Sequence, residues 1–175
     1  FGPDEEHYIA WLPMVARGAV EAAVTIGADT RTHVGTGYHD HNWGNVAPRK
    51  VLDHWYWGRA RVGDYTVVTL NFISHARYDM ARLPAVMIAR GGRIVASAVG
   101  AEHVGFTGSD VVAHPETRIP VDRVLRYRVG EGDESFVVTF RHQRDVSILD
   151  FGAAGAYLRF VGDVELEHAV GGVTE

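Results

Sequence analysis

Cysteine is absent from the 175 residues of the chain. Without thiols the chain can form neither a disulfide framework nor a thiolate metal site, and it has no cysteine nucleophile. A chain without cysteine also fits a reducing compartment, so we expect a cytoplasmic protein.

Lysine and long apolar runs are also scarce. Lys50 is the only lysine among 17 basic residues, and the net charge is −5. The sequence has no basic run or stripe, so it lacks the electrostatic footprint of a nucleic-acid-binding protein. No apolar stretch approaches the roughly 18 residues of a membrane-spanning helix, and no signal peptide is visible. We therefore expect no nucleic-acid partner and no membrane span.

The sequence also lacks a convincing helical periodicity. Valine, isoleucine, threonine and aromatic residues occur in short runs, and 20 glycines separate these runs at intervals suited to tight turns. The pattern predicts roughly ten antiparallel strands, which is typical of a closed barrel or a sandwich. The expected strands are residues 7–15, 19–26, 33–43, 54–62, 65–74, 84–89, 93–99, 121–129, 135–141 and 157–168.

Residues 35–44, with the sequence GTGYHDHNWG, concentrate polar groups in an expected strand. Buried polar groups cost free energy unless each is paired, so such a concentration needs a reason. One interpretation is a polar network that closes one end of a barrel. The other is a functional site. Strand alternation gives the segment two faces, Tyr38 with Asp40 and Asn42, and His39 with His41 and Trp43.

Asp40 is the candidate catalytic acid of this segment, and Tyr38 is its candidate partner. A carboxylic acid can protonate a carbon–carbon double bond or a carbonyl only if it keeps its proton near neutral pH, which burial beside aromatic rings favours. Tyr38, on the same face, is placed to orient the acid or to donate a second hydrogen bond. Asn42 is placed to hold a carbonyl group or an attacking water. The sequence has no G-x-S-x-G nucleophile motif.

A metal site is the competing interpretation of the histidines. His39 and His41 share one strand face, and His33, His54 or His75 are candidates for a third ligand. The chain has ten histidines, and ten scattered histidines produce such spacings by chance. We therefore expect no metal, and we expect the histidines to form hydrogen bonds or interface contacts.

Residues 55–59, with the sequence WYWGR, place Trp55, Trp57 and Arg59 on one strand face. In a core these side chains would be bulky packing. In a barrel lumen they would form a flat wall for a long or fused-ring ligand, with Arg59 binding a carboxylate or an enolate. A buried Arg59 would need a partner, for which Asp40 and Asp53 are candidates.

These segments resemble the AttH/CrtC-like lipocalin family, which includes carotenoid 1,2-hydratases and Diels–Alderase-type cyclases. The similar residues are 37–44, the preceding Trp11-Leu-Pro13, the following residues 55–59 and 64–68, and YLRF at 157–160. The resemblance implies a lipocalin-like antiparallel β-barrel. It also implies two such barrels in a whole protein, with residues 1–15 as the tail of the first and residues 16–175 as the second. A second lipocalin-like domain or a homodimer is the expected partner.

The same resemblance, together with the residues, leads to the expected function. We expect a cofactor-independent cyclase that closes a ring in a large apolar polyketide- or polyene-derived natural-product intermediate. The alternatives are a hydratase of a carotenoid or terpenoid double bond, and a non-catalytic carrier of a hydrophobic ligand. The resemblance places the Tyr-x-Asp pair on Tyr38 and Asp40. The expected substrate-binding residues are His39, His41, Asn42, Trp43, Trp55, Trp57 and Arg59.

Overall fold

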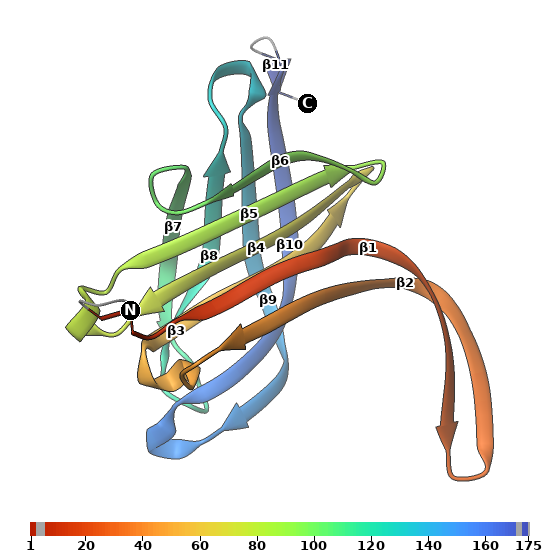
Figure 1. Ribbon diagram of the computed structural model, residues 1–175, viewed down its shortest axis with the longest axis horizontal. Coiled ribbons are helices and arrows are strands. Elements are labelled where there is room, and N and C mark those ends of the chain that lie inside the picture. Colours follow the sequence, from red (N-terminus) through yellow and green to blue (C-terminus); the bar gives the residue numbers. More distant parts are fainter. Residues whose placement is uncertain (3–5, 171–172, 175) are drawn as a thin grey trace. The chain divides into compact units, whose positions relative to one another are not determined.

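The computed structural model describes residues 1–2, 6–170 and 173–174, and these residues form β-strands joined by turns and short 3-10 helices (Figure 1). None of the described helices is long and apolar enough to span a membrane. The 3-10 helices are η1 (Pro48–Lys50), η2 (Ala76–Tyr78), η3 (Gly132–Glu134) and η4 (Gly152–Ala154). The strands are β1 (Ile9–Ile26), β2 (Asp29–Gly44), β3 (Leu52–Val62), β4 (Tyr65–Ser74), β5 (Arg82–Arg90), β6 (Arg93–Val99), β7 (Val104–Ala113), β8 (Pro120–Val129), β9 (Phe136–Asp150), β10 (Ala156–Val170) and β11 (Val173–Thr174).

The strands form three sheets, with the orders β1-β2, β3-β4-β5-β6 and β11-β10-β9-β8-β7. The strand pairs β1/β2, β3/β4, β7/β8, β8/β9 and β9/β10 are all antiparallel. The expected all-β, lipocalin-like antiparallel fold is therefore confirmed. Within the described ranges the three sheets are open, whereas a closed barrel was expected.

The chain divides into two compact units. Unit 1 contains Phe1–Arg82 and Met87–Val95, and unit 2 contains Leu83–Val86 and Ala96–Glu175, so β5 and β6 contribute residues to both. Each unit has its own buried apolar residues. In unit 1 they include Val51, Leu52, Val67, Val68, Leu70, Ile73 and Ile88, and in unit 2 they include Val86, Val104, Leu125, Tyr127, Val129, Phe136 and Val138.

In unit 1, β1 is one continuous strand where the sequence predicted two. Its register with β2 shifts between Pro13 and Val15 and again between Val15 and Gly18. Such irregularities let a strand continue past a proline, which has no backbone N–H to donate to the ladder, and past a glycine. The pairing resumes beyond them and continues to the turn at Ile26 and Asp29.

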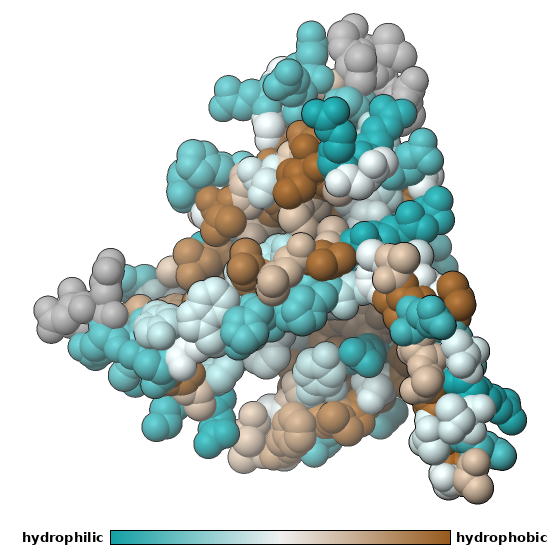
Figure 2. Space-filling view, turned by 45° about the vertical axis from the view of Figure 1, so that its right-hand side comes forward, coloured by the Kyte–Doolittle hydropathy of each residue, from teal (hydrophilic) through white to brown (hydrophobic). Residues whose placement is uncertain are grey.

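The outer half of the β1–β2 hairpin is exposed over almost its whole length. The two strands stay side by side to the tip (Figure 1), and Figure 2 shows hydrophobic side chains among hydrophilic ones on the hairpin surface. An isolated two-stranded hairpin gains little stability in water, because it buries few side chains. The exposed apolar side chains of this half are Val20, Val24, Ile26 and Val34.

Unit 2 differs from the sequence prediction in three of its strands, one of which is the unpredicted two-residue β11. β7 was not predicted, and it pairs with β8 along Val104 to Ala113. β9 was expected to end at residue 141, but it continues to Asp150 by means of two register shifts against β10. Partner strands therefore impose extended structure on segments whose own residues favour turns.

Candidate active site

Three strands of unit 1 bring together five side chains, among them the carboxylate of Asp40. Asp40 Oδ2 accepts a hydrogen bond from the indole Nε1–H of Trp11 at 2.8 Å and another from the Tyr38 hydroxyl at 3.0 Å. The Tyr38 ring contacts the Trp57 ring, with 5.3 Å between the centroids. The guanidinium carbon of Arg59 lies 5.5 Å from the Tyr38 ring centroid. We call these five residues the Asp40 cluster.

Local strand geometry explains how the Asp40 cluster forms. Tyr38 and Asp40 are two residues apart on β2, so their side chains leave the same face. Trp57 and Arg59 have the same spacing on β3. In the β1–β2 ladder Pro13 is opposite Asp40, and Trp11 is one side-chain pair further along the same face. The indole of Trp11 therefore reaches Asp40 diagonally across the two strands.

Burial raises the pKa of Tyr38 to about 12 from its ordinary value of 10.0. Trp57 and Trp11 oppose this shift through hydrogen bonds, whereas the hydrogen bond to Asp40 and the charge of Asp40 add to it. Tyr38 is consequently a neutral hydroxyl at neutral pH. It acts as a hydrogen-bond donor to Asp40 and does not serve as a phenolate base.

Arg59 supplies the positive charge of the Asp40 cluster. It is half-buried, and no carboxylate among the described residues forms a salt bridge with it. The two partners proposed from the sequence are engaged elsewhere: Asp53 bonds the ring of His54 at 2.7 Å, and Asp40 accepts from Trp11 and Tyr38. The guanidinium faces the Tyr38 ring as a cation–π contact, so its N–H donors remain available to a ligand oxygen.

The other residues predicted to bind substrate lie outside these contacts. His39, His41, Asn42 and Trp43 are exposed. The rings of His41 and Trp43 contact each other, with 5.3 Å between the centroids, which agrees with their expected position on one face of β2. Trp55 precedes Trp57 on the same face of β3, and both indoles are 43% exposed. Their roles in binding remain predictions.

The described residues include no group of three or more histidine, aspartate or glutamate side chains that is placed to hold a metal ion. His33 lies in the outer half of the hairpin, whereas the His75 ring bonds the carbonyl oxygen of Arg49 at 2.9 Å. His54 bonds Asp53. These three histidines, which were the candidate third ligands, thus lie apart from one another or bond other groups.

Sequence reasoning did not single out a second polar cluster, which lies in unit 2. His114 Nδ1 accepts hydrogen bonds from the backbone N–H groups of Glu116 and Thr117, so its Nε2 is left to donate to Asp145 Oδ2 at 3.3 Å. His142 Nε2 lies 3.1 Å from Asp145 Oδ1. Burial acts to raise the pKa of Asp145, but the hydrogen bonds and charges of His142 and His114 outweigh it and lower that pKa below 3.8.

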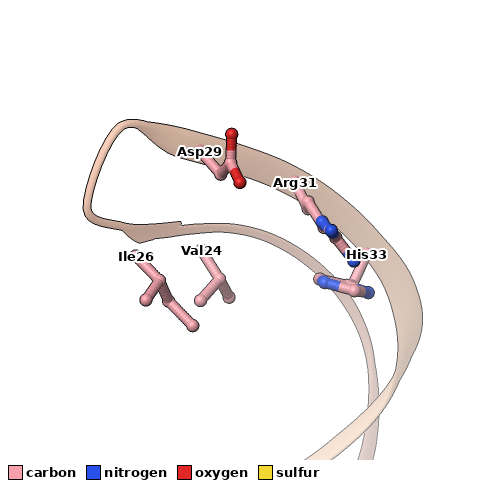
Figure 3. Close-up of a pocket in the computed structure, with 5 residues that line it drawn as sticks. All are labelled: Val24, Ile26, Asp29, Arg31 and His33. Carbon is pink, nitrogen blue, oxygen red and sulfur yellow. The ribbon is translucent and has the colours of Figure 1, made fainter.

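A hollow of about 390 Å³ lies at the outer end of the β1–β2 hairpin, away from the Asp40 cluster (Figure 3). Figure 3 shows that its apolar side chains, Val24 and Ile26, come from β1 and that its polar side chains come from β2. These polar residues are Asp29, Arg31 and His33. Because an exposed hairpin fixes side chains poorly, we place the candidate site at the Asp40 cluster.

A sequence profile described as Diels-Alderase-like matches residues 3–107, which is more than half of the chain. The chain belongs to the Diels-Alderase-like family. The matched range contains every member of the Asp40 cluster, and the histidine–aspartate cluster of unit 2 lies beyond it. Membership of a Diels-Alderase-like family agrees with the natural-product cyclase family expected from the sequence.

Two curated relatives of this Diels-Alderase-like chain are named quinolone epoxide rearrangement proteins. The protein penF from Penicillium thymicola is 30% identical over 142 residues, covering 79% of this chain and 37% of penF. The protein asqO from Emericella nidulans is 27% identical over 142 residues, covering 75% of this chain and 35% of asqO. The chain thus spans little more than a third of the length of these relatives.

A solved structure has a similar fold. The crystal structure of CghA with Sch210972 matches with a TM-score of 0.64 and 16% sequence identity, covering 95% of this chain and 51% of CghA. At this identity the likeness concerns the fold alone. The strands of this Diels-Alderase-like chain are thus arranged as in about half of CghA.

Proposed function

We propose that the chain belongs to a cofactor-independent enzyme that cyclises or rearranges a large apolar natural-product intermediate. The observation that supports this proposal is the Asp40 cluster. It combines a carboxylate that accepts two hydrogen bonds, a neutral tyrosine and a guanidinium that forms no salt bridge with any carboxylate in the described part of the chain, all within the Diels-Alderase-like range. The nature of the intermediate, polyketide- or polyene-derived, is part of the proposal.

In the proposed mechanism the Asp40 cluster orients and polarises the substrate. The flat face of Trp57 would pack against the apolar part of the substrate and hold it in a reactive conformation. Arg59 would donate hydrogen bonds to an oxygen that becomes negative in the transition state, where a fixed charge is most effective. Asp40, with Tyr38 bound to it, would contact a polar group next to the reacting atoms.

Rearrangement of an epoxide fits the same arrangement. When a C–O bond of an epoxide breaks, negative charge develops on the oxygen, and the guanidinium of Arg59 is suited to stabilise it. Two relatives are named for quinolone epoxide rearrangement, which makes a quinolone epoxide the first substrate to test. Hydration of an alkene would need Asp40 to carry a proton on Oδ1, because Oδ2 accepts hydrogen bonds from both Trp11 and Tyr38.

We also propose that the chain is related to the AttH/CrtC-like lipocalins. We propose as its partner either a second lipocalin-like domain or a second copy of the chain. Four apolar side chains near the start of β1 are exposed and would be covered by such a domain: Tyr8, Leu12, Met14 and Val15. The proposed boundary between residues 15 and 16 falls at the second register shift of β1. Cytoplasmic localisation stays part of this proposal, supported by the absence of cysteine.

The proposal is tested by incubating the purified protein with a quinolone epoxide in buffer without added cofactor and by following the products by liquid chromatography and mass spectrometry. We expect an isomer of the substrate to form faster than without protein. Quenching of tryptophan fluorescence measures binding in the same samples. Binding without any conversion would contradict the enzymatic proposal and support the non-catalytic carrier.

A further inference from the structure

The Asp40 carboxylate has two oxygens in different situations. Oδ2 accepts both hydrogen bonds, from Trp11 at 2.8 Å and from Tyr38 at 3.0 Å. Oδ1 has no hydrogen-bond partner among the residues that the structure describes. A carboxylate held by two donors on one oxygen cannot turn freely about its side-chain torsion.

We propose that Trp11 is a positioning residue, which fixes Asp40 so that Oδ1 accepts a hydrogen bond from an N–H or O–H group of the substrate. This inference rests on the proposed function, because it assigns a task to one member of the Asp40 cluster. It also narrows the substrate class to molecules with a hydrogen-bond donor beside the reacting atoms. Asp40 then acts as an acceptor, and Tyr38 acts as a second positioning group.

The alternative role for Trp11 is simple packing, and two observations favour positioning. First, Trp11 is more deeply buried than the other three tryptophans, and its N–H is bonded to Asp40. The side chains of Trp43, Trp55 and Trp57 are 43–45% exposed. Second, the indole N–H bonds a carboxylate, and a hydrogen bond to a charged acceptor is about twice as strong as a neutral one.

The directions of the two hydrogen bonds make Oδ2 an acceptor and leave Oδ1 free for a third group. An indole N–H can only donate a hydrogen bond. Tyr38, a neutral hydroxyl at neutral pH, donates its only proton to the same Oδ2. A carboxylate satisfies both donors at once, and its remaining lone pairs on Oδ1 accept from a third donor. A substrate N–H or O–H group supplies that donor without disturbing the other two bonds.

The first test needs no substrate. The Trp11 indole N–H signal in the ¹⁵N spectrum of the protein is the one that is lost in the Trp11→Phe variant. The Asp40→Asn variant weakens the hydrogen bond from this N–H because the amide is neutral. We expect this signal to move upfield in Asp40→Asn. It should stay in place in Asp53→Asn, which makes the same chemical change on β3 at a residue bonded to His54. An unmoved signal in Asp40→Asn would overturn the inference.

The second test uses two probes, a quinolone with a free N–H and its N-methyl analogue, and measures binding by fluorescence. Trp11→Phe keeps the aromatic bulk and removes the donor, so it should weaken binding of the N–H quinolone by about tenfold. It should leave binding of the N-methyl analogue unchanged. Equal losses for both probes would assign Trp11 to packing and overturn the inference.

A thermodynamic cycle completes the test. If Trp11 acts through Asp40, Trp11→Phe has no further effect on N–H quinolone binding in the Asp40→Asn background. Additive losses would overturn the positioning role. These binding results are separate from turnover. If the wild-type protein binds the two quinolones differently but converts no quinolone epoxide, the proposed reaction fails while the positioning role of Trp11 stands.

Discussion

Gly44, the last residue of β2, lets β1 approach closely at the start of the hairpin. A Cβ atom added at Gly44 would lie 2.5 Å from the carbonyl oxygen of Tyr8 and 3.3 Å from the Cα atom of Ile9. Both neighbours are backbone atoms, and Ile9 is the ladder partner of Gly44. The clash in Gly44→Ala is relieved by moving the backbone of Tyr8 and Ile9 away from β2. Overpacking of this kind costs about 1–3 kcal/mol of unfolding free energy.

Gly35 is the matched control in the same strand. A Cβ atom at Gly35 has no heavy atom within 4 Å, and the residue is not in the left-handed region. Gly35→Ala should therefore change the unfolding free energy by no more than about 0.5 kcal/mol. Urea unfolding followed by tryptophan fluorescence measures both variants. Equal midpoints for Gly44→Ala and Gly35→Ala would refute the close approach of β1 to β2.

Three further predictions concern titration and metal. Because the pKa of Tyr38 is raised to about 12, the folded state holds the hydroxyl proton more tightly than the unfolded state. The unfolding free energy should therefore fall between pH 10.0 and 12. Urea unfolding of Tyr38→Phe should show a smaller fall over this pH range. The pKa of Asp145 is lowered in the folded state, so ionised Asp145 adds fully to the unfolding free energy above pH 3.8, and this stabilisation is lost as the pH falls below that value. Asp145→Asn should therefore make the urea unfolding midpoint less sensitive to acid. Dialysis against EDTA should leave quinolone epoxide conversion unchanged; a loss that zinc restores would contradict this.

Strand alternation predicted much of the candidate site. It placed Tyr38 with Asp40 and His41 with Trp43, and in the structure each of these pairs is in contact. Alternation depends only on the spacing within one strand, so it can be inferred from a single segment. The bond between Trp11 and Asp40 depends instead on the register between two strands, which the shifts beside Pro13 determine.

Sequence analysis missed β7 and the extension of β9 for a common reason. β7 contains Gly105, Gly108 and Asp110, and Asp110 has a φ of 55°, so its local preferences resemble those of a turn. The extension of β9 begins with His142 and Gln143, and its two register shifts interrupt the alternation. In both cases the partner strand supplies the hydrogen bonds, and a partner is not visible in the segment's own sequence.

The rate of conversion of a quinolone epoxide by the Asp40→Asn variant tests the central claim most directly. The amide keeps the size of the side chain but loses the charge that accepts hydrogen bonds from Trp11 and Tyr38 and that contacts the substrate in the proposed mechanism. We predict a fall in kcat of at least about 100-fold relative to the wild-type protein and to Asp53→Asn, because loss of one preorganised polar group in an active site costs on this order. Wild-type kcat in Asp40→Asn, with the substrate still bound, would contradict the assignment of the Asp40 cluster as the active site.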